Sequence, residues 1–401
     1  MEHREHHQST EAQRPPTRGW RKLLLVVGAV LVVLIGLIVL GAFVPGIPGV
    51  GLVGSTLSGY AAWIAVAALV GTAACIWLVI RRRAAWRVAF LAITGATAIG
   101  AVVITGQLMA VGSANGAPVN PFASPVAASA PDDTHVYARA DGSPLDVAVW
   151  KPSAPRSSSG TAPVVMFVHG GGWISGSATD DSGDKRWYAD HGWLVLSVDY
   201  SLSSDTKHEW NTAVRQVECA MVWAGDHAAD YNGDISRFAV IGDSAGGNLA
   251  INASYRADSG SSEPSCAGTV PKVSAVATAY PAVDPVSFYD NDDLLLGPAS
   301  KGVAKYLGGT PTEYPDRYRS VASTTYITPE APPTLVLAAT SDHLVPPIGA
   351  YRFVDEARGA GVDVSLVKVP HAEHVFDLAP LGKQLRLGIT EAWLEDQGLL
   401  D

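Results

Sequence analysis

The chain has 401 residues, of which 48% are hydrophobic and only 16% are charged, and its formal net charge is −10. So low a charge content excludes an intrinsically disordered chain, and the acidic balance argues against a general nucleic-acid-binding protein. The charge is unevenly divided, because residues 1–131 sum to +6 and residues 132–401 therefore sum to −16.

Three long apolar runs occupy the first part of the chain. Leu23–Val44, Tyr60–Ile80 and Val88–Val111 each contain at least 20 residues and no Asp, Glu, Lys, Arg or His. A bilayer core of about 30 Å needs roughly 20 helical residues, so each run can span a membrane. A cleaved signal peptide has one apolar stretch of about 7–15 residues, and soluble helices of this length normally show a polar face. The sequence therefore predicts three transmembrane helices within residues 23–111.

Basic residues flank these runs on one side of the predicted membrane. They end the N-terminal segment 1–22 and recur as four arginines between residues 81 and 87, whereas the turn 45–59 has no charge. Since basic loops stay in the cytoplasm, we expect residues 1–22 to form a cytoplasmic tail. Three crossings then place the chain after residue 111 on the extracytoplasmic side of the cell membrane. Residues 112–131 are rich in Ala, Pro and Ser and predict a linker.

Residues 132–401 alternate short β-type runs with longer helical ones. Short apolar runs suit the buried strands of a parallel sheet, and their alternation with helices predicts an α/β domain with helices on both sheet faces. An antiparallel hairpin is expected first, near His135–Ala140 and Leu145–Pro152. The further predicted strands are Val164–Val168, Leu194–Val198, Phe238–Ile241, Val273–Ala277, Leu335–Ala339 and Val364–Val369. The predicted helices are Lys207–Asp226, Gly247–Ala257, Pro347–Gly359 and Leu381–Gln397.

One late segment, Asp284–Pro329, is rich in Tyr, Pro, Asp and Gly and has no clear strand. It lies between the sixth and seventh predicted strands. A long insertion over the carboxyl ends of parallel strands lies above the place where such domains bind ligands. We therefore expect this segment to form a lid or a wall of a substrate pocket.

Cysteine and histidine spacing gives no sign of a zinc site, and the sequence indicates no metal or organic cofactor. Cys219 and Cys266 fall in the part of the chain expected outside the cell, where an oxidising compartment allows a disulfide. Two separate buried thiols are the alternative. Cys75 lies within the second apolar run and is expected to stay single.

The motif Gly-Asp-Ser-Ala-Gly at 242–246 directly follows a predicted strand and precedes a predicted helix. This is the context that a nucleophile elbow requires, because a sharp turn between strand and helix lifts a serine hydroxyl clear of the sheet. The helix N-terminus behind the turn favours a developing negative charge. Ser244 is therefore a candidate nucleophile, with a structural turn serine as the alternative.

A second motif, His-Gly-Gly-Gly-Trp at 169–173, directly follows the strand predicted at Val164–Val168. Consecutive glycines let backbone N–H groups turn toward a ligand, and in acyl transfer such donors stabilise the oxyanion. A phosphate-binding loop is the competing interpretation, but no Lys stands in the P-loop position and no G-x-G-x-x-G is complete. The two motifs together indicate acyl transfer far more specifically than either does alone.

From about Asp132 to its end the chain resembles the α/β-hydrolase fold and, within it, the hormone-sensitive-lipase-like esterases. The resemblance rests on HGGGW at 169–173, VDYSL at 198–202, GDSAGG at 242–247, TSDHLVP at 340–346 and HVF at 374–376. It implies that Ser244 is the nucleophile, Asp342 the orienting acid and His374 the general base, in the chain order of the family. Two departures are Ser201, where the family usually has Arg, and Val375, where it usually has Gly.

The same resemblance implies roles for the residues around the triad. The oxyanion hole would consist of the backbone N–H groups of Gly171, Gly172 and Ala245. His169 and Gly170 would be structural parts of the glycine loop, and Trp173 would either pack the pocket or stack on substrate. Asp243 is expected to support the elbow.

Rivals exist for the acid and the base. Asp284 follows the sixth predicted strand, but Asp342 is preferred because it follows the seventh. His371 lies three residues before His374, which is preferred because the family pattern includes the following Phe. His343 is expected to be a solvent-facing neighbour.

The expected function is that of a membrane-anchored serine hydrolase, which cleaves carboxylic esters with short, medium or lipid-like acyl groups through an acyl-enzyme. An amidase or formamidase-type hydrolase is the alternative within enzymes, since the triad also serves amides. A non-catalytic binding protein on the hydrolase fold is the alternative outside them, and the intact trio of Ser244, Asp342 and His374 argues against it.

Overall fold

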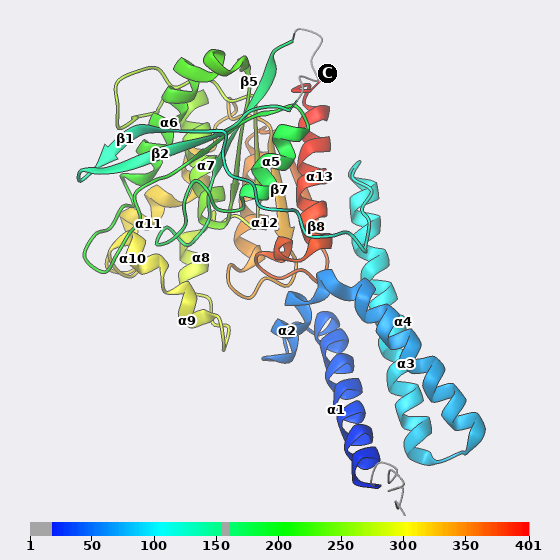
Figure 1. The fold of residues 1–401 in the computed structure, drawn as a ribbon. Coiled ribbons are helices and arrows are strands. Elements are labelled where there is room, and N and C mark those ends of the chain that lie inside the picture. Colours follow the sequence, from blue (N-terminus) through cyan, green and yellow to red (C-terminus); the bar gives the residue numbers. More distant parts are fainter. Residues whose placement is uncertain (1–17, 154–159, 401) are drawn as a thin grey trace, which may run out of the picture.

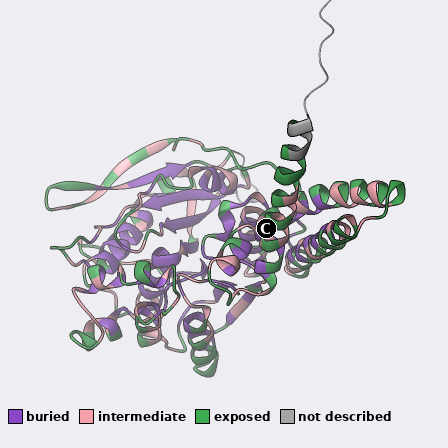
Figure 2. Ribbon diagram, turned by 90° about the horizontal axis from the view of Figure 1, so that it is seen from below, coloured by how far each residue is buried: buried purple, intermediate pink, exposed green. Residues whose placement is uncertain are grey.

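The computed structural model of the protein describes residues 18–153 and 160–400, so most of the predicted tail, residues 1–22, lies outside the described residues. A bundle of long helices projects from one end of an α/β body (Figure 1). The two parts differ in burial, because the central strands of the body are buried while the long helices expose much of their apolar surface (Figure 2).

The three predicted apolar runs form α1 (Arg18–Phe43), α3 (Ala61–Arg81) and α4 (Ala85–Ala114). Each of these helices is long and apolar enough to cross a membrane. α3 and α4 form an antiparallel hairpin, and α1 packs beside α4 (Figure 1). The arginine-rich turn between α3 and α4 lies at the end of the bundle that is remote from the α/β body.

The uncharged connection between α1 and α3 is more ordered than a simple turn. It contains α2 (Val50–Thr56) and the 3-10 helix η1 (Ser58–Tyr60), which lie next to the α/β body (Figure 1). Two glycines let α2 fold back closely onto the end of α1. A Cβ atom on Gly51 would lie 1.9 Å from the carbonyl oxygen of Pro45, and one on Gly54 would lie 2.2 Å from the backbone nitrogen of Ala42.

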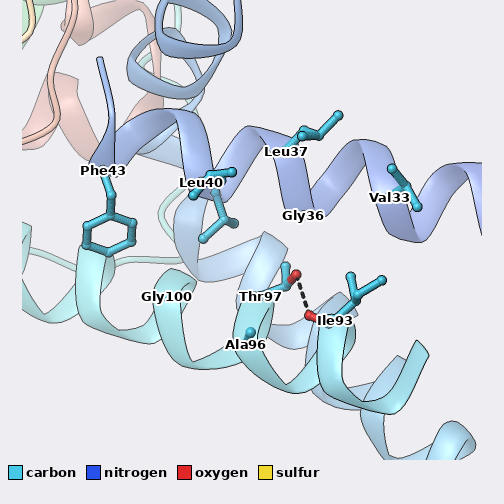
Figure 3. Close-up of a pocket in the computed structure, with 10 residues that line it drawn as sticks. Val33, Gly36, Leu37, Leu40, Phe43, Ile93, Ala96, Thr97 and Gly100 are labelled. Carbon is cyan, nitrogen blue, oxygen red and sulfur yellow. Dashed lines mark hydrogen bonds between the residues drawn. The ribbon is translucent and has the colours of Figure 1, made fainter. Parts of the chain in front are cut away.

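A groove of about 400 Å³ runs between α1 and α4 (Figure 3). Its lining is apolar except for Thr97, whose hydroxyl donates to the carbonyl oxygen of Ile93 within its own helix at 2.8 Å. The groove therefore presents a surface of the kind that lipid tails cover, and it lies apart from the chemical motifs.

The α/β body is built on one eight-stranded sheet with the order β1-β2-β4-β3-β5-β6-β7-β8. β1 and β2 form the predicted antiparallel hairpin, and β3 to β8 run parallel. The strands are β1 (Asp133–Ala140), β2 (Ser143–Trp150), β3 (Ala162–Val168), β4 (Leu194–Val198), β5 (Gly233–Asp243), β6 (Ala275–Ala279), β7 (Thr334–Ala339) and β8 (Val364–Val369). This sheet confirms the predicted α/β fold class.

Helices cover both faces of the sheet, as predicted. One core contains side chains of α6 (Ala213–His227), α7 (Ser244–Asp258) and α12 (Pro347–Gly359). The other contains side chains of α5 (Ser182–Asp190) and α13 (Pro380–Asp396). Ile104 and Leu108 of α4 belong to this second core, so the last turns of the third long helix are packed into the α/β body.

Some predicted boundaries are wrong for identifiable reasons. α6 begins at Ala213 rather than Lys207, because Glu209 is held in a preceding turn by the hydroxyl of Ser203 and the ammonium of Lys207. β6 begins two residues later than predicted, since the N–H of Val273 faces Asp258 instead of the ladder.

Other elements escaped the sequence analysis. The short polar helix α5 has no apolar stripe and was not expected. Within the segment 112–131, Ala117 and Val119 are buried, and Asn120 exchanges two hydrogen bonds with Gln384 of α13. The segment between the long helices and the α/β body therefore follows the surface of that body.

The insertion Asp284–Pro329 folds into short helices that lie over one end of the body (Figure 1). They are α8 (Pro285–Tyr289), α9 (Gly297–Ser300), α10 (Val303–Leu307), α11 (Pro315–Val321) and the 3-10 helix η3 (Ser323–Tyr326). A further 3-10 helix, η2 (Ala228–Tyr231), follows α6, and η4 (Phe376–Leu378) precedes α13. A disulfide joins Cys219 to Cys266, with 5.5 Å between their Cα atoms.

Candidate active site

The turn after β5 holds Ser244 at the carboxyl edge of the sheet. β5 ends at Asp243 and α7 begins at Ser244, whose φ of 52° lies in the left-handed region. Small neighbours make this turn possible, because a Cβ atom on Gly242 would lie 2.3 Å from the carbonyl oxygen of Gly246. A Cβ atom on Gly246 would lie 2.1 Å from the carbonyl oxygen of Val168. The motif thus has the strand–turn–helix geometry of a nucleophile elbow.

Three side chains from distant parts of the chain form a continuous row. His374 Nε2 lies 3.0 Å from Ser244 Oγ, and His374 Nδ1 lies 2.7 Å from Asp342 Oδ2. The second carboxylate oxygen of Asp342 accepts hydrogen bonds from the N–H groups of Leu344 and Val345, which fixes its orientation. All three side chains of the row are buried. A hydroxyl, an imidazole and a carboxylate arranged in this way can activate the hydroxyl as a nucleophile.

The two rivals lie elsewhere. Asp284 caps α8, where its side chain accepts hydrogen bonds from two backbone N–H groups. The ring of His371 faces the long helices, with Nδ1 at 2.7 Å from the carbonyl oxygen of Ala42 and Nε2 at 2.6 Å from Oε1 of Gln107. The structure therefore brings Asp342 and His374 to Ser244, and engages both rivals in other contacts.

The charge of Asp342 acts on its neighbour. Burial lowers the pKa of His374, but the charge and the hydrogen bond of Asp342 outweigh burial and raise this pKa above its ordinary value. Burial raises the pKa of the Asp342 carboxyl, and the imidazole opposes that rise. The pair therefore favours proton uptake at His374, which is the property that a general base needs.

The glycine loop faces the same space as Ser244. Gly171 and Gly172 have φ values of 100° and 62°, and a Cβ atom on Gly171 would lie 2.1 Å from the carbonyl oxygen of Ser175. The N–H of Ala245 lies in the first turn of α7, where backbone N–H groups have no partner within the helix. Gly171 and Gly172 line the same cavity as Ser244, so the backbone that the sequence predicts to form an oxyanion hole lies beside the serine hydroxyl.

Two residues of the same motif serve the loop itself. His169 Nδ1 lies 2.8 Å from the carbonyl oxygen of Gly170, and the ring stacks on Tyr200 with 4.3 Å between centroids. Burial lowers the pKa of His169, which favours its neutral form. Trp173 is fully buried and stacks on Tyr306 with centroids 4.6 Å apart. Trp173 therefore belongs to the hydrophobic core behind the loop and is not among the residues that line the cavity beside Ser244.

A cavity of about 310 Å³ opens beside Ser244 and His374. The insertion Asp284–Pro329 supplies part of its wall, as predicted from its place in the chain. Asp243 also borders the cavity, and burial raises the pKa of its carboxyl to about 6, although the charge of Arg386 opposes the rise. The apolar side chains of the lining are Ile174, Phe288, Ala299, Val303, Leu344 and Val375.

One predicted environment is wrong, and two residues beside the site were missed. His343 is largely buried rather than solvent-facing, because its Nδ1 lies 2.5 Å from Oε2 of Glu373. Glu373 was missed although it directly precedes His374, because an acidic residue in a loop normally faces water. Ser55 was missed as well, since its partner Glu373 is 318 positions away in the chain. Among the described residues, no cluster of three or more His, Cys, Asp or Glu side chains is placed to hold a metal ion.

Comparison with known proteins places the α/β body in one family. The BD-FAE family model matches residues 152–356, which include the glycine loop, Ser244 and Asp342. Esterase LipQ of Mycobacterium tuberculosis is 29% identical over 222 residues, which cover 54% of this chain and 51% of that protein. Hormone-sensitive lipase of Bos taurus is 30% identical over 181 residues, which cover 43% of this chain and 22% of the lipase. This chain thus spans about half the length, or less, of these curated relatives.

Solved structures show the same fold. The apo form of Thermogutta terrifontis esterase 2 superposes with a TM-score of 0.54 at 22% sequence identity, covering 67% of this chain and 96% of that one. Its propionate-bound form gives a TM-score of 0.53 at 23% identity, covering 67% and 95%. The α/β-hydrolase fold predicted from the motifs is therefore confirmed.

Proposed function

The chain belongs to the BD-FAE family and has the α/β-hydrolase fold, and from this premise we propose that it is a membrane-anchored serine hydrolase that cleaves carboxylic esters. The observation that carries the proposal is the row from Asp342 through His374 to Ser244 beside the glycine loop. A buried hydroxyl, imidazole and carboxylate at an elbow are the parts that acyl transfer requires.

In the proposed reaction, His374 takes the proton of Ser244 as the hydroxyl oxygen attacks the ester carbonyl carbon. Asp342 holds the imidazole in the correct tautomer and stabilises the imidazolium that forms. The N–H groups of Gly171, Gly172 and Ala245 stabilise the negative oxygen of the tetrahedral intermediate. His374 then gives its proton to the leaving alcohol, and water releases the acid from Ser244 by the same steps.

The cavity favours an apolar acyl group. Apart from the glycine loop, Asp243 and the catalytic row, its lining consists of Ile174, Phe288, Leu344 and further apolar residues. Its volume of about 310 Å³ lies at the small end of ligand pockets, which suits a short or medium acyl chain better than a large rigid one. Ile174 and Val375 line the cavity and are also exposed, so they offer an apolar surface along which a longer, lipid-like chain can extend.

We further propose that the three long helices anchor this enzyme in the cell membrane with its α/β body on the extracytoplasmic side. The charge pattern supports this orientation, since the arginine-rich turn after α3 lies at the end of the helices remote from the body (Figure 1). Protease added to intact cells should digest the α/β body. Digestion only after lysis would reverse the topology.

Covalent labelling tests the chemistry. The full-length protein should react with a fluorophosphonate probe at Ser244 and hydrolyse p-nitrophenyl esters, most rapidly those with short or medium acyl chains. Ser244→Ala should abolish both, while Ser175→Ala, at an exposed hydroxyl of the glycine loop, should still be labelled. A folded wild-type protein that is neither labelled nor hydrolytic would favour a binding role, and preferential hydrolysis of matched p-nitroanilides would favour an amidase.

A further inference from the structure

Glu373 connects the catalytic loops to the membrane anchor. It is 4% exposed and directly precedes His374. Its Oε1 accepts hydrogen bonds from the backbone N–H of His374 at 3.1 Å and of His343 at 2.6 Å. Its Oε2 accepts from the hydroxyl of Ser55 in α2 at 2.6 Å and lies 2.5 Å from Nδ1 of His343. The carboxylate of Glu373 therefore contacts three segments: the loop that carries His374, the loop that carries Asp342, and α2.

His343 extends this connection from the other side. It directly follows Asp342, and its Nε2 lies 2.9 Å from the carbonyl oxygen of Pro45, just beyond the end of α1. A carboxylate and a carbonyl oxygen can only accept hydrogen bonds, so both ring nitrogens must carry protons. The pair is therefore an imidazolium and a carboxylate, and the pKa of His343, raised to about 9 by its hydrogen bond with Glu373, agrees with this geometry.

A second contact ties the same loop to the anchor. His371 reaches the carbonyl oxygen of Ala42 at the end of α1 and the side chain of Gln107 in α4. The ring of Phe43 packs edge-on against His371, with 4.9 Å between centroids. The loop after β8, which carries His374, is thus held at two points by residues of the membrane region.

We propose that the segment that links the first two membrane spans is needed for catalysis. Through its contacts with Glu373 and His343, it positions Asp342 and His374 for reaction with Ser244. Pro45, Ser55, His343 and Glu373 are hereafter called the anchor junction. They are positioning residues, because they act through the catalytic row rather than on the substrate. The proposal rests on the proposed function, since it requires the row to be catalytic.

The junction should affect turnover more than substrate binding. None of its four residues lines the cavity beside Ser244. Loss of a junction hydrogen bond would let the imidazole depart from the line between Asp342 and Ser244, and misplacement of a catalytic group lowers the rate of the chemical step. An interaction that acts only on the chemical step lowers kcat and leaves KM unchanged when substrate binding equilibrates rapidly.

The test compares full-length variants reconstituted in lipid nanodiscs. Ser55→Ala removes one hydroxyl and should lower kcat about 3–10-fold, and Glu373→Gln removes the charge and should lower it about 10–100-fold, both at constant KM. The rate of fluorophosphonate labelling at Ser244 should fall by similar factors. Thr56→Ala is the matched control, because the exposed hydroxyl of Thr56 bonds only to Leu52 of its own helix and its loss should change neither rate.

The outcomes separate the possible failures. Wild-type kcat and labelling in both Ser55→Ala and Glu373→Gln would overturn the anchor junction while leaving the proposed function intact. A rise in KM with unchanged kcat would also overturn the proposal, since the junction would then act on substrate binding rather than on the chemical step. A wild-type protein that neither reacts with the probe nor cleaves esters would overturn the proposed function and the junction together. If Glu373→Gln does not fold, Ser55→Ala decides, because that change leaves the Glu373–His343 pair in place.

Discussion

Ser244, the proposed nucleophile, and the two loops that carry Asp342 and His374 are held in place by different contacts. Ser244 lies where β5 meets α7, and its backbone is constrained by the close packing of Gly242 in the strand and Gly246 in the helix. Asp342 and His374 lie on loops whose neighbours, His343 and Glu373, contact residues between the first two apolar spans. A sheet can fix a turn by steric exclusion alone, whereas loops need partners for their polar groups. In this chain some of those partners belong to the segment between α1 and α3.

The sharpest comparison lies within a single loop. His374→Ala should lower kcat on the order of 10⁴-fold, because it removes the only base placed on Ser244 in the described structure. His371→Ala removes contacts with Ala42 and Gln107 and should lower kcat by less than about tenfold. Steady-state kinetics on one ester measures both. Equal losses in the two variants would contradict the assignment of His374.

The sequence indicated the turn of Ser244 and the glycine loop more directly than it indicated Asp342, His374 and the residues that position them. The elbow and the glycine loop are local motifs, so short stretches of sequence were enough to make Ser244 a candidate nucleophile and to predict a glycine loop that binds an oxyanion, while the choice of Gly171 and Gly172 came from the family resemblance. Asp342 and His374 needed the family resemblance, since Asp284 and His371 had similar positions in the chain. The strands of the sheet were predicted because buried parallel strands are continuously apolar.

The contacts of the anchor junction could not be predicted from the sequence, for a physical reason. The hydrogen bond from Ser55 to Glu373 joins residues 318 positions apart, and no local pattern encodes such a contact. His343 was expected in water because isolated histidines on loops usually are exposed, but its pairing with Glu373 offsets the cost of burial. The helical structure of α2 was hidden for a similar reason, since glycines that disfavour helices elsewhere are needed here for close packing on α1.

Removing one member of the buried ion-pair cluster around Arg386 should strongly destabilise the α/β body. Arg386 of α13 pairs with Asp184 of α5 and with Asp377, and all three are buried. Arg386→Met leaves Lys383 as the remaining cation of the two buried carboxylates, 3.0 Å from Asp184 and 3.8 Å from Asp377, and should lower the free energy of unfolding by about 3–5 kcal/mol. Pulse proteolysis in urea measures this change. The exposed pair of Arg319 and Asp316 supplies the control, since Arg319→Met should alter stability little. Similar effects of the two substitutions would contradict the distinction.

The disulfide offers a change that should affect stability without affecting the catalytic row. Cys219 lies on α6, and its partner Cys266 closes a loop of 47 positions. Replacing both by Ala should lower the free energy of unfolding by about 2–4 kcal/mol, because the unfolded chain regains freedom. Below the unfolding temperature, kcat should stay at its wild-type value. A fall in kcat comparable to that of Ser55→Ala would mean that any loss of stability in the α/β body disturbs the catalytic row. That result would contradict a specific role of the anchor junction.

The smallest expected effect is a dependence on alkaline pH. The pKa of His343 is raised from 6.5 to about 9, by its hydrogen bond with Glu373 and with a contribution from the charge of Asp293. A raised pKa in the folded state means that the protonated pair stabilises the junction fully below pH 6.5 and that this stabilisation is lost as the pH rises through about 9.

Wild-type kcat should rise with pH as His374 loses its proton and becomes available as the base, and should then fall a few-fold, reversibly, around pH 9 as His343 loses its proton. His343→Gln has no group to titrate there, so its kcat should be lower than that of the wild type at neutral pH and should lack this alkaline fall. The Ser244→Ala protein measures spontaneous ester hydrolysis, which is subtracted at each pH. If the His343→Gln profile fell in parallel with the wild type, another group would be titrating, and the junction could not be the cause. A fall confined to the wild type would instead trace the change in kcat to the imidazolium of His343, which connects the loop of Asp342 to the segment between α1 and α3.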